Sequence, residues 1–501
     1  MTVQQSKVSR RLKETTAPEV NDYIYRPRLE GFATGFAALG DVNKAHVVML
    51  SEQGLIRQEH AAVLARGVLA MEAAGADQVP LDPSREDAYF NYEAHLIEQI
   101  GADIGGRLHT GRSRNDILAT LDRLRCRDTL LALIDALCDV RQAALDNAIR
   151  FAQVVMPGYT HLQPAQPVTY GYYLAAVEQA LARDTQRLAQ TLQAMNHSPL
   201  GAAAFAGTPF AIDRARTADL LGFDGVVDNA LDAVGSRDFI LESLSHLNLL
   251  AVFWSRVAQD YFVWSTHEFS LIDFPDSIAA TSSIMPQKKN PTVLEYLKGR
   301  SGHIMGLLMG ACATVKGTNF SHTGDASREG TRGFWEAAEE TLRCLKLFGL
   351  MLRTATPNQA LALRRAGEDF STATGLADLI VREADLSFRE AHHVVGAAVR
   401  QAMDAGLPAS RIDSAMVDAC AQEQLGHALG LDPEQVRQSL DPTTNVQSRA
   451  SQGGPALSAL STSLAAATTR LSQQRADAQA WRERLARARQ HLQAATEQVA
   501  Q

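Results

Sequence analysis

The segment between Pro209 and Pro275 contains no proline, and no other feature of the sequence constrains the fold as strongly. Inside it, apolar residues recur at steps of four and three along a single helical stripe, at Ile240, Leu244, Leu247, Ala251, Trp254 and Ala258. Positions on the opposite side, such as Leu249, Val252 and Phe253, are apolar too. A helix that is hydrophobic nearly all round must be covered on several sides. The pattern therefore predicts a long helix inside a helical bundle.

Comparable helical patterns cover residues 116–153, 168–195, 291–316 and 333–354, and alternating β-branched runs are nearly absent. The 501 residues exceed the roughly 250–300 that a single core can serve, so several packed regions are expected. We predict an all-α fold with almost no sheet. A central long-helix bundle at 113–364 is expected to be flanked by two smaller helical domains, at 1–112 and 365–501. The Gln-, Ala- and Arg-rich end from residue 472 onward is expected to form a polar surface helix.

Charge and composition exclude several classes of partner. The chain has 48 basic and 56 acidic residues, a net charge of −8 and no dense basic stripe, so neither nucleic acid nor a membrane is expected as a partner. No signal-peptide pattern is found, and no run approaches the ~18 apolar residues of a membrane span. The five cysteines form no C-x-x-C pair, which indicates reduced thiols in a cytoplasmic protein. No P-loop, Rossmann glycine pattern or H-E-x-x-H motif is found, so no cofactor and no metal are predicted.

Three segments interrupt the helical patterns and concentrate polar residues. The first, at residues 105–116, combines glycines with three arginines. Glycine lets the backbone approach a ligand, and arginine binds a carboxylate through two parallel hydrogen bonds. It is interpreted either as an anion site or as a connector whose arginines cap helix ends. The second, at residues 156–167, holds His161 in a proline-rich, non-helical stretch. This histidine could transfer protons near neutral pH, or it could be structural.

The third segment, residues 281–291, is a polar loop with two adjacent serines, two lysines and two amides, and a helix is expected to begin near Pro291. Such a loop can close over an anion. The alternative is a surface connector, but a solvated connector does not need the apolar Ile284 and Met285 at its centre. The composition of the loop therefore favours a functional role.

In this order and at these separations, the three segments resemble the signature regions of the fumarase/aspartase superfamily. Residues 282–291 are similar to its SS-x-M-P-x-K-x-N-P loop. Details of residues 105–116 and 156–166 resemble the argininosuccinate lyase branch, and the likeness extends from about residue 45 to residue 455. The resemblance implies a fumarase/aspartase-like fold and a carbon–nitrogen lyase that cleaves an N-substituted aspartate to fumarate and an amine. It also implies a homotetramer whose active sites are shared between chains.

The resemblance assigns roles to individual residues. Ser282 matches the base that removes the Cβ proton, and Lys288 matches a cation that stabilises the negative charge formed. His161 matches the residue associated with protonation of the departing nitrogen, and Glu295 matches its carboxylate partner. For Glu295 a helix charge in the first turn is the alternative interpretation. The substrate-binding positions are Ser113, Arg114, Asn115, Thr160, Gln287, Asn290 and His322.

The region expected to hold the amine departs from the argininosuccinate lyase pattern. The usual Tyr, Gln and Lys are replaced by His322, Ser327 and Gly330, and the Asp after Asn-Pro is replaced by Thr292. A site built for polar partners discriminates strongly when those partners are missing, so the amine is predicted to differ from arginine. A diamine or an amino acid is expected, as in the aminopolycarboxylate lyases, which resemble this branch. Two alternatives remain open: an ordinary argininosuccinate lyase of arginine biosynthesis, and a non-catalytic structural homologue of the crystallin kind. The second alternative would not require the catalytic residues that the chain retains.

Overall fold

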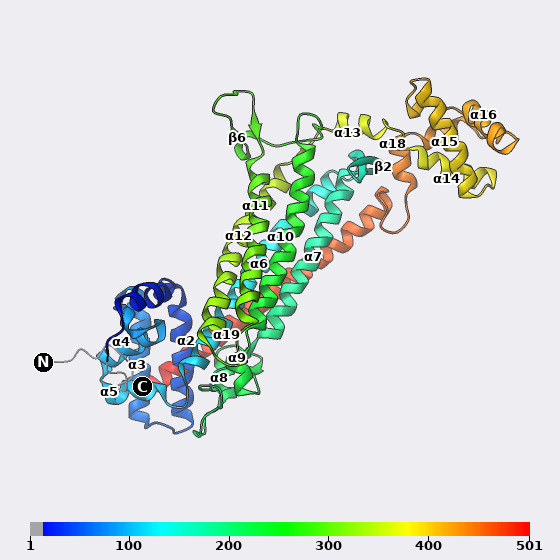
Figure 1. The fold of residues 1–501 in the computed structure, drawn as a ribbon. Coiled ribbons are helices and arrows are strands. Elements are labelled where there is room, and N and C mark those ends of the chain that lie inside the picture. Colours follow the sequence, from blue (N-terminus) through cyan, green and yellow to red (C-terminus); the bar gives the residue numbers. More distant parts are fainter. Residues whose placement is uncertain (1–13) are drawn as a thin grey trace.

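The computed structural model describes residues 14–501 and is dominated by helices, which confirms the predicted all-α fold. Five long helices form an inclined column through the middle of the molecule (Figure 1). They are α6 (Arg114–Arg150), α7 (Tyr170–Met195), α10 (Asp238–Trp264), α11 (Thr292–Val315) and α12 (Gly330–Thr354). Their buried faces form one hydrophobic cluster that includes Trp254, Phe334 and Phe348. The proline-free segment therefore contributes a bundle helix, as its pattern predicted.

A smaller set of helices lies at the lower end of the column in Figure 1 and is built from residues that precede α6. It consists of α1 (Pro18–Val20), α2 (Phe32–Glu52), α3 (Gln58–Ala74), α4 (Ala88–Ile100) and α5 (Ala102–Gly105). Its buried side chains form a second hydrophobic cluster, to which α6 contributes Ile117, Leu121 and Leu124. The start of α6 is therefore packed against this N-terminal set.

A second small set lies at the opposite end of the bundle (Figure 1). It consists of α14 (Ala373–Ala384), α15 (Phe388–Asp404), α16 (Ser414–Leu425) and α17 (Pro433–Ser439), which share their own hydrophobic cluster. Two connecting helices, α13 (Gln359–Ala366) and α18 (Pro442–Ser448), join this set to the bundle. A central bundle with a smaller helical set at each end is the architecture that was predicted, whereas the boundaries proposed at residues 112 and 364 stay predictions.

The final helix, α19 (Leu457–Ala500), runs back along the bundle as far as the N-terminal set (Figure 1). Its 44 residues span about 66 Å at 1.5 Å per residue. Buried side chains recur on it every seven residues, at Leu464, Leu471, Ala478, Leu485, Leu492 and Val499. The first four belong to the cluster of the bundle and the last two to the N-terminal cluster. The polar helix expected from residue 472 thus carries a narrow apolar seam of the coiled-coil kind.

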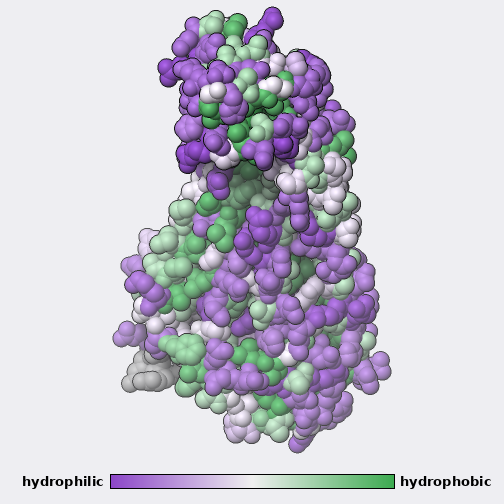
Figure 2. Space-filling view, turned by 90° about the vertical axis from the view of Figure 1, so that its right-hand side faces the viewer, coloured by the Kyte–Doolittle hydropathy of each residue, from purple (hydrophilic) through white to green (hydrophobic). Residues whose placement is uncertain are grey.

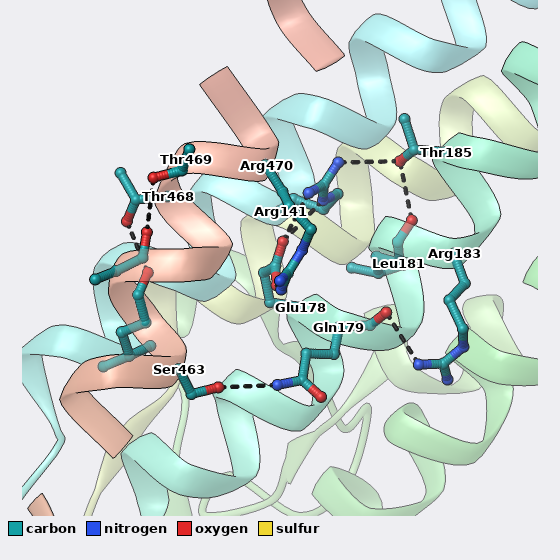
Figure 3. Close-up of polar contacts among 12 residues, drawn as sticks. Arg141, Glu178, Gln179, Leu181, Arg183, Thr185, Ser463, Thr468, Thr469 and Arg470 are labelled. Carbon is teal, nitrogen blue, oxygen red and sulfur yellow. Dashed lines mark hydrogen bonds and ion pairs between the residues drawn. The ribbon is translucent and has the colours of Figure 1, made fainter. Parts of the chain in front are cut away.

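A fully buried ion pair links α6 to α7 beside α19 (Figure 3). Arg141 donates from Nε and Nη2 to Oε1 of Glu178 at 3.0 and 2.8 Å, and both side chains are 0% exposed. From α19, Arg470 lies 3.9 Å from the other oxygen of Glu178, and Gln474 accepts a hydrogen bond from Arg141. Because an isolated buried charge is very costly, this pair specifies how the three helices sit together.

Removing one partner of this pair is expected to destabilise the protein strongly. Glu178→Ala leaves the Arg141 guanidinium buried without its carboxylate, so the free energy of unfolding should fall by about 3–5 kcal/mol. Urea denaturation followed by circular dichroism measures the change. The matched control is the double variant Arg141→Met/Glu178→Leu, which leaves no unpaired charge and should lose much less. Equal losses in the two variants would show that packing, and not the unpaired charge, sets the effect.

Within residues 14–501, sheet is limited to four two-stranded pairs, in agreement with the prediction of almost no sheet. An antiparallel hairpin of β1 (Val155–Thr160) and β2 (Gln163–Thr169) separates α6 from α7, and β6 (Ala280–Thr281) pairs with β7 (Lys289–Asn290) before α11. The remaining elements are β3 (His197–Ser198), α8 (Arg214–Leu220), β4 (Gly225–Val226), α9 (Ala230–Gly235), β5 (Ile272–Asp273) and β8 (Thr356–Pro357). No helix in the described part of the chain is long and apolar enough to cross a membrane.

Candidate active site

The first polar segment ends in a capping box at the start of α6. Ser113 is the N-cap residue, and its Oγ accepts a hydrogen bond from the Asn115 N–H at 3.4 Å. In return, Oδ1 of Asp116 accepts from the Ser113 N–H at 2.9 Å. The other oxygen of Asp116 accepts from the N–H groups of Gly201 and Ala203 at 2.8 and 2.9 Å. One buried carboxylate therefore ties the predicted substrate-binding residues to a second loop.

Arg114 lies beside two acidic residues from the N-terminal set. Its Nη1 is 2.7 Å from Oε2 of Glu86 and 3.2 Å from Oδ2 of Asp87. The same oxygen of Asp87 accepts a hydrogen bond at 3.0 Å from Nη2 of Arg328, which precedes α12. Asp87 also caps α4, where its Oδ1 accepts from the Phe90 N–H. This buried acid therefore holds two guanidinium groups side by side.

The predicted contact His322 belongs to the same region. Burial, and after it the guanidinium groups of Arg237, Arg328 and Arg114, lower the pKa of its imidazole from 6.5 to about 4, so the ring is neutral at physiological pH. The side chain is half-buried, and within residues 14–501 its buried Nδ1 has no hydrogen-bond partner. Arg114 and His322, which the sequence placed more than two hundred residues apart, are thus brought close together.

The second polar segment forms the β1–β2 hairpin, with His161 and Leu162 as the turn between the paired residues Thr160 and Gln163. Both turn residues have positive φ, at 55° and 57°, as a two-residue turn of type I′ requires. Thr160 and His161 are exposed. The predicted non-helical stretch is therefore a hairpin that presents His161 at its tip.

The third polar segment is a loop closed at its base by the β6–β7 pair. Inside it, Oγ of Ser282 accepts hydrogen bonds from the backbone N–H groups of Met285 at 3.1 Å and Ile284 at 3.4 Å. Two N–H donors stabilise negative charge on an oxygen, which is what a serine base needs. Lys288 and Gln287 are exposed on the same loop. The Ile284 side chain is 83% exposed, so residues 14–501 do not cover the apolar centre of this loop.

Two further predicted residues flank this loop. Asn290 donates from Nδ2 to the carbonyl oxygen of Thr281 at 3.4 Å, and Glu295 lies exposed in the first turn of α11. No hydrogen bond or ion pair joins Glu295 to His161 among the described residues of one chain. The pairing of Glu295 with the imidazole of His161, which the resemblance implies, is therefore not formed within a single subunit.

The predicted site residues fall into two groups at opposite ends of the bundle. Ser113, Arg114, Asn115 and His322 lie near the start of α6, whereas the hairpin and the β6–β7 loop lie at its far end (Figure 1). The 37 residues of α6 alone span about 55 Å. One chain therefore brings Arg114 to His322 but does not bring either of them to His161 or Ser282.

Several residues that build the site were not singled out by the sequence. The capping role of Asp116 was visible in the S-x-x-D spacing that opens α6. Asp87, Arg237 and Arg328 carried no such local signal, because each acquires its role only from residues distant along the chain. These contacts are consequences of the tertiary fold.

The buried carboxyl of Asp116 predicts an unusual dependence of stability on pH. Burial raises its pKa from 3.8 to about 6, although the N–H donors and Arg112 oppose the shift. Since the folded pKa exceeds the unfolded one, this group contributes most below pH 3.8, and its contribution is lost as the pH rises through about 6. The stability of wild type relative to Asp116→Asn should therefore decrease from pH 4 to pH 7 and then level off.

Unfolding of both proteins by urea across this pH range measures the difference. If the free energy of unfolding of wild type relative to the variant rises with pH, the raised pKa of Asp116 is contradicted. The Asn variant should also bind a ligand of the adjacent Ser113–Asn115 segment more weakly, because its amide nitrogen would face backbone N–H groups that now donate to an oxygen. A raised KM with a folded protein is the expected outcome.

Comparison with known proteins places this arrangement in a family. A lyase family model matches residues 30–306, and a model of the argininosuccinate lyase C-terminal region matches residues 370–447. Argininosuccinate lyase 1 of Shouchella clausii is 38% identical over 447 residues, which cover 89% of this chain and 90% of that protein. The argininosuccinate lyase of Methanothermobacter thermautotrophicus is 40% identical over 421 residues, which cover 84% of this chain and 90% of that protein.

Solved structures agree with these relatives. EDDS lyase in complex with formate aligns with a TM-score of 0.86 and 32% identity, over 97% of this chain and 96% of that chain. The class II fumarase of Schistosoma mansoni, at 16% identity, shares the fold with a TM-score of 0.68, over 82% of this chain and 90% of that chain. Fold and site loop together define a carbon–nitrogen lyase of the fumarase/aspartase superfamily. Within that superfamily the chain belongs to the argininosuccinate lyase branch, as its motifs predicted.

Proposed function

We propose that this lyase eliminates an amine from an N-substituted aspartate and leaves fumarate. The observation that carries the proposal is the geometry of Ser282, whose oxygen accepts two backbone N–H groups in a loop that also bears Lys288. Ser282, as an alkoxide, takes the Cβ proton, and the electron pair moves into the adjacent carboxylate to form a doubly charged aci-carboxylate. The electron pair of the aci-carboxylate then returns to form the Cα=Cβ double bond of fumarate, while the Cα–N bond breaks and its own electron pair leaves with the nitrogen.

The other predicted residues serve the two halves of this reaction. Lys288 and Asn290 stabilise the aci-carboxylate, and Arg114 with its neighbours binds the carboxylates of the fumarate half. His161 gives its proton to the departing nitrogen, and Glu295 orients the imidazole and favours its charged form. Ser113, Asn115, Thr160 and Gln287 complete the fumarate half, and the reaction requires no cofactor.

This chemistry requires several chains, because in one subunit the two groups of site residues lie at opposite ends of a helix about 55 Å long. We propose a homotetramer in which each active site takes the Arg114 region, the hairpin and the Ser282 loop from different chains. Oligomerisation also explains why both catalytic elements at the far end of the bundle are exposed in a single chain.

The exposed faces of α10 and α11 support this assembly. On α11, a Cβ atom placed on Gly299, Gly302, Gly306 or Gly310 would meet nothing within 4 Å. Between these glycines, Met305 and Met309 are 45% and 63% exposed, and Leu249 on α10 is 49% exposed. Figure 2 shows hydrophobic side chains at the surface along one flank of the bundle. Exposed apolar surface on long bundle helices is typical of a protein–protein interface.

The proposed amine product differs from arginine, because His322, Ser327, Gly330 and Thr292 replace the polar residues expected around an arginine half. The relatives named argininosuccinate lyase favour a second candidate, cleavage of argininosuccinate itself. A non-catalytic crystallin-like role is the third candidate.

One absorbance assay separates these candidates. Purified protein is mixed with argininosuccinate while fumarate is followed by its absorbance, and the reverse reaction is run with fumarate and a panel of amines. We expect fumarate to be consumed with an amine other than arginine. Rapid release of fumarate from argininosuccinate would establish the second candidate, and no reaction under any condition would favour the third.

A further inference from the structure

The environment of His322 indicates which chemical class of amine this site accepts. The segment that carries His322 packs closely against the end of α9, since a Cβ atom added to Gly235 would lie 3.3 Å from Cα of Ser321. The hydroxyl of Ser327 is already used, because it donates to the carbonyl oxygen of Thr323 at 2.7 Å. Gly330 has no room for a side chain, since a Cβ there would lie 2.5 Å from Cγ2 of Val315. Of the three replaced positions, only His322 has a polar side chain free to meet an amine.

Three guanidinium groups act on the His322 imidazole, those of Arg114, Arg237 and Arg328, and each of them lowers its pKa. The acids beside these arginines already face them: Arg114 contacts Glu86 and Asp87, Arg328 contacts Asp87, and Nε of Arg237 lies 3.8 Å from Asp122. Within residues 14–501, His322 itself forms no hydrogen bond or ion pair with an acid, so no acid is positioned there to attract a second cation.

Arg237 supplies the second observation. Its side chain is only 2% exposed, and its Nη1 donates to the carbonyl oxygens of Val234 and Ser236 at 3.1 and 2.6 Å. Within residues 14–501, however, Nε and Nη2 have no hydrogen-bond partner, and Nε lies 3.8 Å from Asp122. Nε thus already faces an acid. Buried guanidinium nitrogens normally find acceptors, so Nη2, together with Nδ1 of His322, indicates a missing anionic or acceptor group.

We propose that the amine released with fumarate carries a carboxylate close to its nitrogen and no second cation, and that Arg237 and Arg328 bind this carboxylate beside His322. The proposal rests on the proposed lyase function. A carboxylate satisfies the unused donors with charge-assisted hydrogen bonds, whereas a second ammonium or a guanidinium is repelled by the arginines. Residue 292 is a threonine and not an acid, so it cannot attract such a cation. Of the two arginines, Arg328 is assigned the specificity because its side chain is the more accessible to a ligand, at 19% exposed against 2% for Arg237.

The experiment compares amines that differ only in the carboxylate. Fumarate consumption is measured with glycine, β-alanine and serine, each paired with its own amide, and with ethylenediamine and arginine. Every pair is compared at equal concentrations of unprotonated amine, because the amide lowers the basicity of the nitrogen. We expect each amino acid to react at least about 10-fold faster, in kcat/KM, than its amide, and the diamine to react slowest.

A variant assigns the preference to Arg328. Arg328→Gln should reduce the amino-acid-to-amide ratio towards one, whatever loss of absolute rate follows from removing the arginine that shares Asp87 with Arg114. A purely structural role would lower both rates equally and leave the ratio unchanged, which would overturn the assignment of Arg328. The matched control is Arg332→Gln, an exposed arginine on α12, which should keep the ratio of the wild type.

The outcomes separate this proposal from the function on which it rests. Fumarate consumption that is equal with amino acids and amides, or fastest with ethylenediamine, would overturn the proposal and leave the lyase function standing. No consumption with any amine, together with no cleavage of argininosuccinate, would overturn both. A clear preference for the carboxylated amines that disappears in Arg328→Gln supports the proposal.

Discussion

Ser282→Ala is expected to lower kcat by about 10²–10⁴-fold, the range that a positioned general base contributes. The reason is local, since only the Ser282 oxygen accepts the N–H groups of Ile284 and Met285 and can carry the charge of an alkoxide there. Steady-state kinetics with any accepted amine measures the loss, and size-exclusion chromatography shows whether assembly is unchanged.

The adjacent serine provides the matched control. Ser283 is exposed on the same loop, and its hydroxyl makes no hydrogen bond to another described residue. Ser283→Ala should therefore retain most of the activity. If the two variants lose activity equally, the loop as a whole matters and Ser282 is not the base. If Ser282→Ala keeps its activity, the assignment is wrong.

Mixing two inactive variants is expected to restore activity, which is the second large effect. Arg114→Gln removes the guanidinium that binds the substrate carboxylate at one end of the bundle, and Ser282→Ala removes the base at the other end. Each variant alone should therefore be nearly inactive. In tetramers assembled at random from equal amounts, a site that takes these residues from different chains has both intact with a probability of ½ × ½. About a quarter of the wild-type activity should return.

A chain with both substitutions, mixed with wild type, is the control for this experiment. Shared sites again predict about a quarter of the activity, whereas sites formed within one chain predict about half, because every wild-type chain would then work alone. Sites within one chain also predict no recovery when the two single variants are mixed. Activity measured after co-expression distinguishes these cases without any assumption about the substrate.

The helices of the bundle were determined by the sequence alone. A proline-free segment with apolar residues on all sides has few alternatives to a buried helix, and the α10 helix at Asp238–Trp264 lies where that pattern placed it. The heptad seam of α19 was also present in the sequence, as leucine, alanine and valine at every seventh position. Composition alone indicated a polar surface helix there, because between the seam positions Gln, Arg and Glu alternate with alanines, which carry little apolar surface.

Local sequence also determined which residue types could perform the chemistry. The serine–lysine loop and the histidine in a proline-rich turn are contiguous motifs, and the N-cap of α6 is set by residues within one helical turn. Each of these features depends on neighbours a few residues away, so each could be predicted without the fold.

Only the tertiary structure decided how these motifs are distributed in space. A rigid helix of 37 residues separates Arg114 from the hairpin, so residues that the family resemblance assigned to one site lie at opposite ends of one chain. The arrangement of Asp87, Arg237 and Arg328 around His322 likewise comes from three distant segments packed together. Electrostatic and packing interactions depend on distance in space and not along the chain, and for that reason the charge of the amine pocket could be determined only from the folded molecule.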